Sequence, residues 1–157
     1  MAKLTSSGYK ALKNEANFGE PISDEVVGGM HIAPEIITRK GETFCAVHWF
    51  HGLPRHDELN ATRFPHGLML FGESVLGCAR RLVKEQLGMK VKGARVLTIE
   101  SYVDKERHWH IEPEILAEVY NSPKKPAKDS RIVRFTLKDT PEMAYWSSTE
   151  FIKFRLC

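Results

Sequence analysis

The chain has 157 residues, of which 42% are hydrophobic and 27% are charged. A chain of this length and composition can bury the core of one globular domain, which argues against a disordered protein. The formal net charge of +3 suits an anionic small ligand but falls short of the dense basic surface that long nucleic acids require.

The cysteines and the apolar segments of the sequence predict the cellular compartment of the protein. Cys45, Cys78 and Cys157 are odd in number and show no CxxC spacing, which predicts reduced thiols in a cytoplasmic protein. No apolar run approaches the length of a membrane span, and residues 1–18 lack the apolar core of a signal peptide. We therefore expect a cytoplasmic protein with no membrane contact.

The elements predicted in chain order are mostly strands. Residues 1–22 are polar and weakly periodic, which indicates a flexible leader before a domain that spans 23–157. Segments rich in β-branched and aromatic residues, bounded by turn signals, follow. The predicted strands are 25–33 and 35–38 around Pro34, 43–50, 94–103, 108–120 with a break or bulge at Pro113, 131–137 and 143–146. Loops are predicted at 51–63 and 121–130.

Two helices complete this prediction. Residues 74–87 form an amphipathic helix that ends at Gly88, a residue that readily takes the left-handed conformation after a helix. A short final helix is predicted over 148–154, with Ser148 as its N-cap. Strands distributed around two helices predict an α/β layered fold with a mixed sheet.

The segment 64–89 carries the most specific spacing in the chain. It resembles the Nudix box, Gly-x5-Glu-x7-Arg-Glu-U-x-Glu-Glu-x-Gly-U, in which U is aliphatic. The residues in register with this motif are Gly67, Glu73, Arg81, Val83, Glu85, Gly88 and Met89. The resemblance covers about 25–157 and implies a Nudix-like α/β/α sandwich with a mixed central β-sheet.

The resemblance also implies a chemistry. Nudix enzymes cleave a nucleoside diphosphate linked to another moiety, and Mg²⁺ or Mn²⁺, which prefer carboxylate oxygens, neutralise the substrate. It assigns Glu85 as the main metal ligand, Gln86 as a weak one, and the backbone carbonyl at His66-Gly67 as another. Glu73 and Arg81 would brace the joint between loop and helix.

This box departs from the family pattern at two carboxylate positions, where Leu82 and Gln86 stand in place of glutamates. GDP-mannose mannosyl hydrolases, a Nudix branch, also have Arg-Leu at the first of these positions, so the chain is partly similar to them. Later glutamates are candidates for the missing ligand or for the base, which His66 could also supply; they are Glu100, Glu112, Glu114 and Glu118. Two functions stay open: a metal-dependent hydrolase, or a catalytically silent module that binds a nucleotide or a protein.

Substrate contacts are predicted outside the box. Arg55 and Arg63 are candidate phosphate contacts, and Trp49 could stack on a nucleobase, although an aromatic residue in a strand is also typical of core packing. His108 and His110 alternate in a strand and could chelate a metal, or form a surface pair. The expected partner is a nucleoside diphosphate derivative, and a homodimer is a further expectation because many relatives of this fold are dimers.

Overall fold

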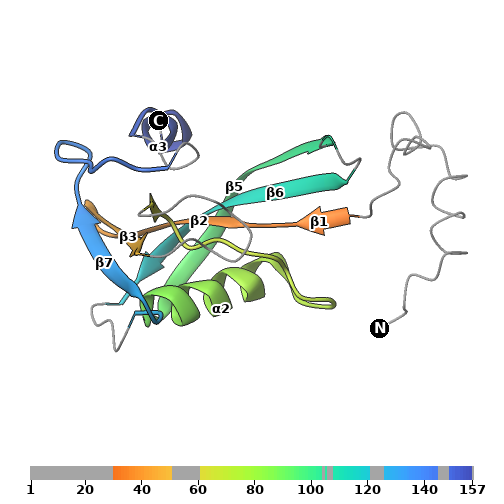
Figure 1. The fold of residues 1–157 in the computed structure, drawn as a ribbon, viewed down its shortest axis with the longest axis horizontal. Coiled ribbons are helices and arrows are strands. Elements are labelled where there is room, and N and C mark those ends of the chain that lie inside the picture. The colour runs from red at the N-terminus through yellow and green to blue at the C-terminus, as the bar shows by residue number, and fades with distance from the viewer. Residues whose placement is uncertain are drawn as a thin grey trace, which may run out of the picture.

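The computed structural model describes residues 30–50, 61–103, 105, 108–120, 126–144 and 149–156. The described strands form one mixed seven-stranded sheet, with helix α2 on one face and helix α3 on the other (Figure 1). The elements are β1 (Met30–Ile32), β2 (Glu35–Lys40), β3 (Thr43–Trp49), β4 (Thr62–Arg63), α2 (Val75–Leu87), β5 (Val91–Val103), β6 (Trp109–Val119), β7 (Ser130–Phe135) and α3 (Thr149–Leu156). This arrangement confirms the predicted α/β/α sandwich with a mixed sheet.

Strand β6 lies in the middle of the sheet. It pairs antiparallel with β5 on one side, and parallel with β1 and β2 on the other. Strands β2 and β3 form a hairpin, and β3 pairs antiparallel with both β4 and β7. Parallel pairing of β2 with β6 needs a long crossover, which the chain makes through α2. None of the described helices is long and apolar enough to cross a membrane.

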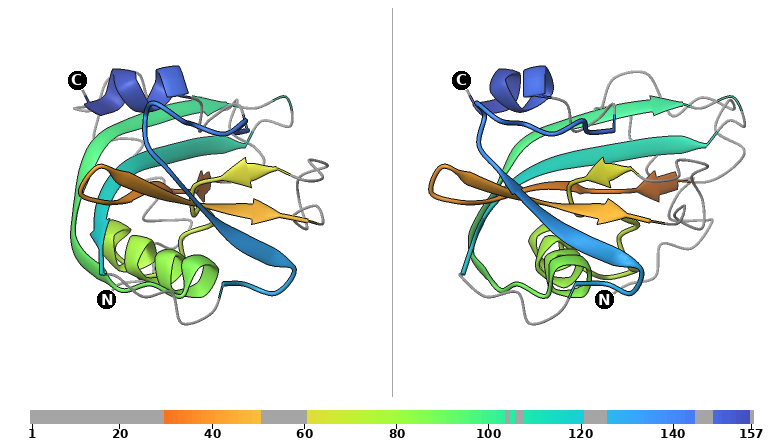
Figure 2. Two further views of the ribbon diagram at one scale, coloured as in Figure 1. Left: turned by 90° about the vertical axis from the view of Figure 1, so that its left-hand side faces the viewer. Right: turned by 60° about the vertical axis from the view of Figure 1, so that its left-hand side comes forward.

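The core has two parts, one on each face of the sheet, because alternate strand residues point to opposite faces. Ile36, Cys45 and Ile115 pack with α2 on one face. On the other face, Ile37 and Leu116 pack in the cluster that contains Ile152 of α3. Two further views show the sheet between these helices (Figure 2). Because both faces are covered here, β2, β3 and β6 each contain a continuous run of buried residues.

The prediction of a break at Pro113 is wrong. Strand β6 runs through Pro113, and the irregularity lies in its partner β5, between Val96 and Thr98. The register that pairs Glu35 with Glu114 places Pro34 opposite Pro113, at the gap between β1 and β2. Proline has no N–H to donate, so a gap between partner strands accommodates it without losing a hydrogen bond.

Several boundaries of the predicted strands and loops differ from those in the structure. The pair Thr62–Arg63 forms β4, although the sequence predicts a loop over 51–63. Met143 and Ala144 form no strand, although the Ala144 N–H donates to the carbonyl of Thr62 at 2.9 Å. The first predicted strand is described from residue 30 onward, while Ser148 and the leader over 1–22 lie outside the described residues.

Helix α2 confirms the prediction for 74–87, and local contacts explain both of its ends. The Ser74 hydroxyl accepts the N–H of Gly77 at 3.0 Å, which caps the first turn. Gly88 takes φ 66°, and its N–H donates to the Lys84 carbonyl. This left-handed conformation favours glycine and ends the helix. The buried residues of α2 are Cys78, Ala79, Leu82, Val83 and Leu87.

Candidate active site

The Glu73–Arg81 pair joins the box loop to α2. Arg81 Nε and Nη2 each donate to one carboxylate oxygen of Glu73 at 2.9 Å. Arg81 Nη2 also donates to the Leu68 carbonyl at 3.0 Å, and the Leu70 N–H donates to Glu73 at 3.0 Å. The hydrogen bonds from Arg81 are the main cause that lowers the Glu73 pKa to about 2. The pair therefore holds the loop in one geometry, as the resemblance implies.

Gln86 uses its side-chain amide to hold the backbone of His66. The amide nitrogen of Gln86 donates to the His66 carbonyl oxygen at 2.6 Å, and the His66 N–H donates back to the amide oxygen at 3.3 Å. We call this pair of bonds the Gln86 clamp. It occupies the carbonyl oxygen at His66-Gly67 that the resemblance assigned to a metal. It also uses the amide oxygen through which Gln86 would itself coordinate.

Leu82 fills the space between α2 and the box loop. Its side chain is only 4% exposed and belongs to the core cluster on the α2 face. A Cβ on Gly67 would lie 3.0 Å from Cδ2 of Leu82, and Gly67 has φ 156°. Gly67 is therefore required by close packing against Leu82, and the position of the family's first helical carboxylate is apolar and closed.

Glu85 lies on the outer surface of α2. Its side chain is 55% exposed, and Arg81 Nη1 donates to it at 3.2 Å across one helical turn. Among the described residues, no three His, Cys, Asp or Glu side chains are grouped so that they could hold a metal ion. A single exposed carboxylate beside an arginine is a poor site for Mg²⁺ or Mn²⁺, which gain affinity from several charged oxygens.

The later glutamates lie on the wrong face of the sheet to assist Glu85. Residues 115, 117 and 119 of β6 pack on the α2 face, so Glu112, Glu114 and Glu118 point to the opposite face. Glu100 pairs in register with Glu112 and points the same way. The expectation that one of these glutamates completes a metal site is corrected by this geometry.

Each of these glutamates has another partner. Arg155 of α3 contacts Glu114 through Nε at 2.6 Å and also pairs with Glu100. Arg39 donates to Glu118 at 2.7 Å, and the Tyr102 hydroxyl donates to Glu112 at 2.9 Å. Burial raises the pKa of Glu114, and the neighbouring Arg155 opposes that rise. The glutamates thus attach α3 and the strands to each other.

A divalent ion in the position that the resemblance implies does not fit the residues present. Leu82 offers no oxygen, the Gln86 clamp occupies the loop carbonyl, and the glutamates of β5 and β6 face away. Glu85 alone supplies charge. The site lacks the ligand charge that a hard cation needs.

The structure places only some of the predicted substrate contacts on the same face of the sheet. Trp49 packs on the α2-face cluster together with Met69 of the box loop, and its buried indole nitrogen has no acceptor within the described ranges. Arg63 is 6% exposed and pairs in register with Val47, so it points to the same face as Trp49. Nδ1 of His66 lies 3.0 Å from the Phe64 carbonyl oxygen, so Nδ1 carries a proton in this arrangement. Arg55 lies outside the described residues.

A histidine of β1 joins the pair that the sequence singled out. The His31 ring stacks on His108 with centroids 4.9 Å apart, and it meets His110 edge-on at 5.1 Å. Ring nitrogens donate their lone pairs in the ring plane, so stacked rings do not converge on one ion. Only the register between β1 and β6 brings His31 here, which no local spacing reveals.

Comparison with known proteins bears on the fold. No protein-family model matches the chain, and no curated protein matches it. A MutT Nudix hydrolase from Burkholderia pseudomallei has a similar structure, with a TM-score of 0.62 and 17% identity over 81% of this chain and 95% of that one. An ADP-ribose pyrophosphatase from Streptococcus suis has a TM-score of 0.61 and 20% identity over 80% and 89% of the two chains. The resemblance in the box and these structural matches agree, and the chain therefore has the fold of the Nudix hydrolases.

Proposed function

We propose that this chain is a Nudix-fold module that binds a nucleoside diphosphate derivative without the carboxylate-rich metal site of the family. The observation that carries the proposal is the Gln86 clamp, in which a neutral amide holds the loop carbonyl at 2.6 Å. An amide N–H can satisfy a carbonyl oxygen as a cation would, but it brings no charge with which to activate water.

The ligand class follows from the position of the site and from the structural neighbours. Arg63 and Trp49 point to the α2 face from adjacent strands, and Trp49 packs in the same cluster as Met69 of the box loop. A guanidinium suits a diphosphate, and an indole offers a surface for a base. Two neighbours are described as an ADP-ribose pyrophosphatase and an ADP compounds hydrolase, which makes ADP-ribose the first ligand to test.

A second candidate is a slow hydrolase that uses Glu85 as its only carboxylate ligand. The observation that favours it is the exposure of Glu85, whose side chain is 55% exposed at a glutamate position of the box. In that case Arg81 would have to release one of its hydrogen bonds before Glu85 could coordinate an ion. A cytoplasmic location and a homodimer stay predictions of the sequence.

The test measures binding and turnover of ADP-ribose by the same preparation. Calorimetric titration is done with Mg²⁺ and then with a chelator, and release of AMP is followed by chromatography. The proposal expects saturable binding that the chelator leaves unchanged, and no AMP above the protein-free rate. The variant Gln86→Glu, which restores one family carboxylate beside Glu85 and leaves the buried Leu82 in place, is expected to gain metal-dependent binding.

Two results would decide against the proposal. Mg²⁺-dependent turnover that is lost in Glu85→Gln, but kept in the matched surface variant Glu42→Gln, would establish the second candidate instead. Absence of binding for ADP-ribose and for related nucleoside diphosphate derivatives would exclude both candidates.

A further inference from the structure

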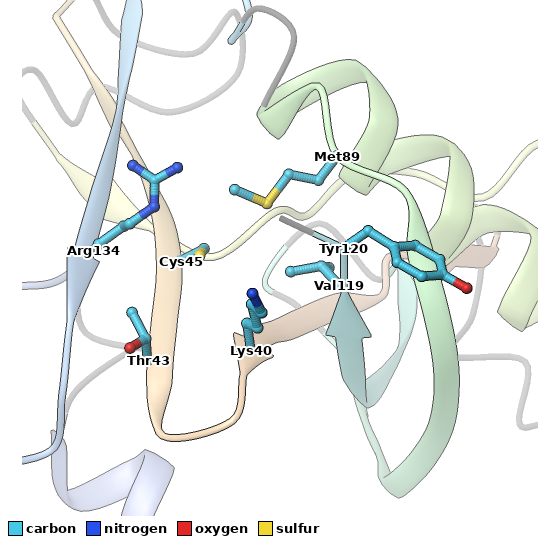
Figure 3. Close-up of a pocket in the computed structure, with 7 residues that line it drawn as sticks. All are labelled: Lys40, Thr43, Cys45, Met89, Val119, Tyr120 and Arg134. Carbon is cyan, nitrogen blue, oxygen red and sulfur yellow. The ribbon is translucent and has the colours of Figure 1, made fainter. Parts of the chain in front are cut away.

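A pocket lies beside the β2–β3 hairpin, close to the C-terminal end of α2. Helix α2 ends at Leu87, and the chain turns at Gly88 into β5 before it reaches the β2–β3 hairpin. Beyond this turn there is a pocket of about 350 Å³ (Figure 3). Its lining residues are Lys40, Thr43, Cys45, Met89, Val119, Tyr120 and Arg134. Trp49, Arg63 and Glu85 are not among them, so the pocket is separate from the proposed nucleotide site.

The floor of the pocket is apolar and its rim is polar. Cys45, Met89 and Val119 are each less than 5% exposed and form the floor. Lys40 and Arg134 are exposed and lie on different strands, β2 and β7. Thr43 and the half-exposed Tyr120 also line the pocket, and the Tyr120 ring is directed away from Arg134 and Cys45 (Figure 3). An apolar floor below polar groups is the usual construction of a small-molecule site.

The charge of the pocket is uniformly positive. Two of its lining residues are cations and none is an acid. Within the described part of the chain, neither Lys40 nor Arg134 forms an ion pair with a carboxylate. Arg134 pairs in register with Cys45. Burial raises the pKa of the Cys45 thiol, and the neighbouring Arg134 guanidinium opposes that rise. Two cations that share a concave surface without an acid attract anions.

We infer that this pocket binds a small phosphate monoester with an aromatic or apolar body. A monoester dianion matches the two cations in charge, and the planar fork of Arg134 suits phosphate oxygens. The ester body would lie against the apolar floor of Cys45, Met89 and Val119. A volume of about 350 Å³ accepts a ligand with one ring rather than a dinucleotide.

Phenyl phosphate is the probe that tests this site, with inorganic phosphate and phenol as its two halves. Isothermal titration of the full chain at low salt should give saturable binding of phenyl phosphate, weaker binding of inorganic phosphate and none of phenol. Arg134→Gln and Lys40→Gln should each weaken phenyl phosphate binding about tenfold or more, because each removes a charge-assisted contact. Phenyl phosphate should also slow alkylation of Cys45 in the Cys78→Ser/Cys157→Ser variant, in which Cys45 is the remaining cysteine.

A matched control lies on the same strand. Arg131 is exposed like Arg134, but it pairs with His48 and points to the opposite face of the sheet. Arg131→Gln removes the same charge and should leave the dissociation constant of phenyl phosphate unchanged within twofold. An equal loss in Arg131→Gln and Arg134→Gln would reduce the effect to net charge and overturn the inference. Failure to observe saturation up to about 10 mM would overturn it as well.

Discussion

The Glu73–Arg81 pair gives the most quantitative prediction, which is that Glu73→Gln lowers the free energy of unfolding at pH 7 by about 2 kcal/mol. The folded chain lowers the Glu73 pKa from 4.5 to about 2, chiefly through hydrogen bonds from Arg81. A difference of this size corresponds to about 3 kcal/mol when it is fully expressed. The side chains of Glu73 and Arg81 remain 16% and 23% exposed, so solvent screening reduces the expected value.

The sign of the pH dependence follows from the same pKa. Because the folded value is lowered, the stabilisation is complete above about pH 4.5 and is lost as the pH falls toward 2. Urea unfolding of the wild type and Glu73→Gln should therefore differ most at pH 7, and by less than half as much at pH 3. Glu73→Gln has no carboxylate at this position to titrate, so its stability should fall less steeply with acid.

The control for this prediction is Glu85→Gln, which removes the other carboxylate that Arg81 contacts. Glu85 is 55% exposed, and an exposed pair one turn apart contributes about 0.5 kcal/mol or less. If Glu73→Gln lowered the free energy of unfolding at pH 7 no more than Glu85→Gln does, the loop would not depend on the part-buried Glu73–Arg81 pair. A gap between wild type and Glu73→Gln that stayed constant from pH 7 to pH 3 would equally refute the electrostatic explanation.

Further substitutions at three positions test the packing of the box. Leu82→Ala should lower the free energy of urea unfolding by about 3 kcal/mol, because it leaves a cavity at a side chain that is 4% exposed, whereas Leu82→Met should cost about 1 kcal/mol. Gln86→Ala should lower the free energy of unfolding by about 2 kcal/mol, because it removes both hydrogen bonds to the His66 backbone. The Gln86→Glu protein should unfold at a lower temperature than the wild type, and Mg²⁺ should partly restore that temperature. Gly88→Ala should cost about 1 kcal/mol, because φ is 66° at that position, and a cost near zero would contradict this account of the helix end.

The layers of the fold and the two ends of α2 could be predicted from the sequence alone. Ser74 and Gly88 act through contacts within one helical turn, so their effect can be read locally. Strand β4 was missed because its two residues become a strand only by pairing with β3, at a position fixed by the tertiary structure. The bulge in β5 was assigned to β6 for a similar reason, since Pro113 is visible in the sequence but its partner strands are not.

Fewer features of the candidate site could be predicted from the sequence. Strand β6 is buried on both faces, so its pattern does not reveal which face meets α2 or where its glutamates point. The partner of Gln86 lies 20 residues away and is a peptide group, which leaves no mark on residue type. The resemblance to the Nudix box implied the Glu73–Arg81 pair, because the motif fixes the positions of a loop residue and a helix residue relative to each other.

The attachment of α3 through Arg155 also makes the charge balance of the sheet depend on this helix. Glu114 is 6% exposed, and Arg155, near the end of the described chain, is the cation that contacts it. Any change that displaced α3 from the sheet would leave this carboxylate in the interior without a counter-charge, which commonly costs several kcal/mol.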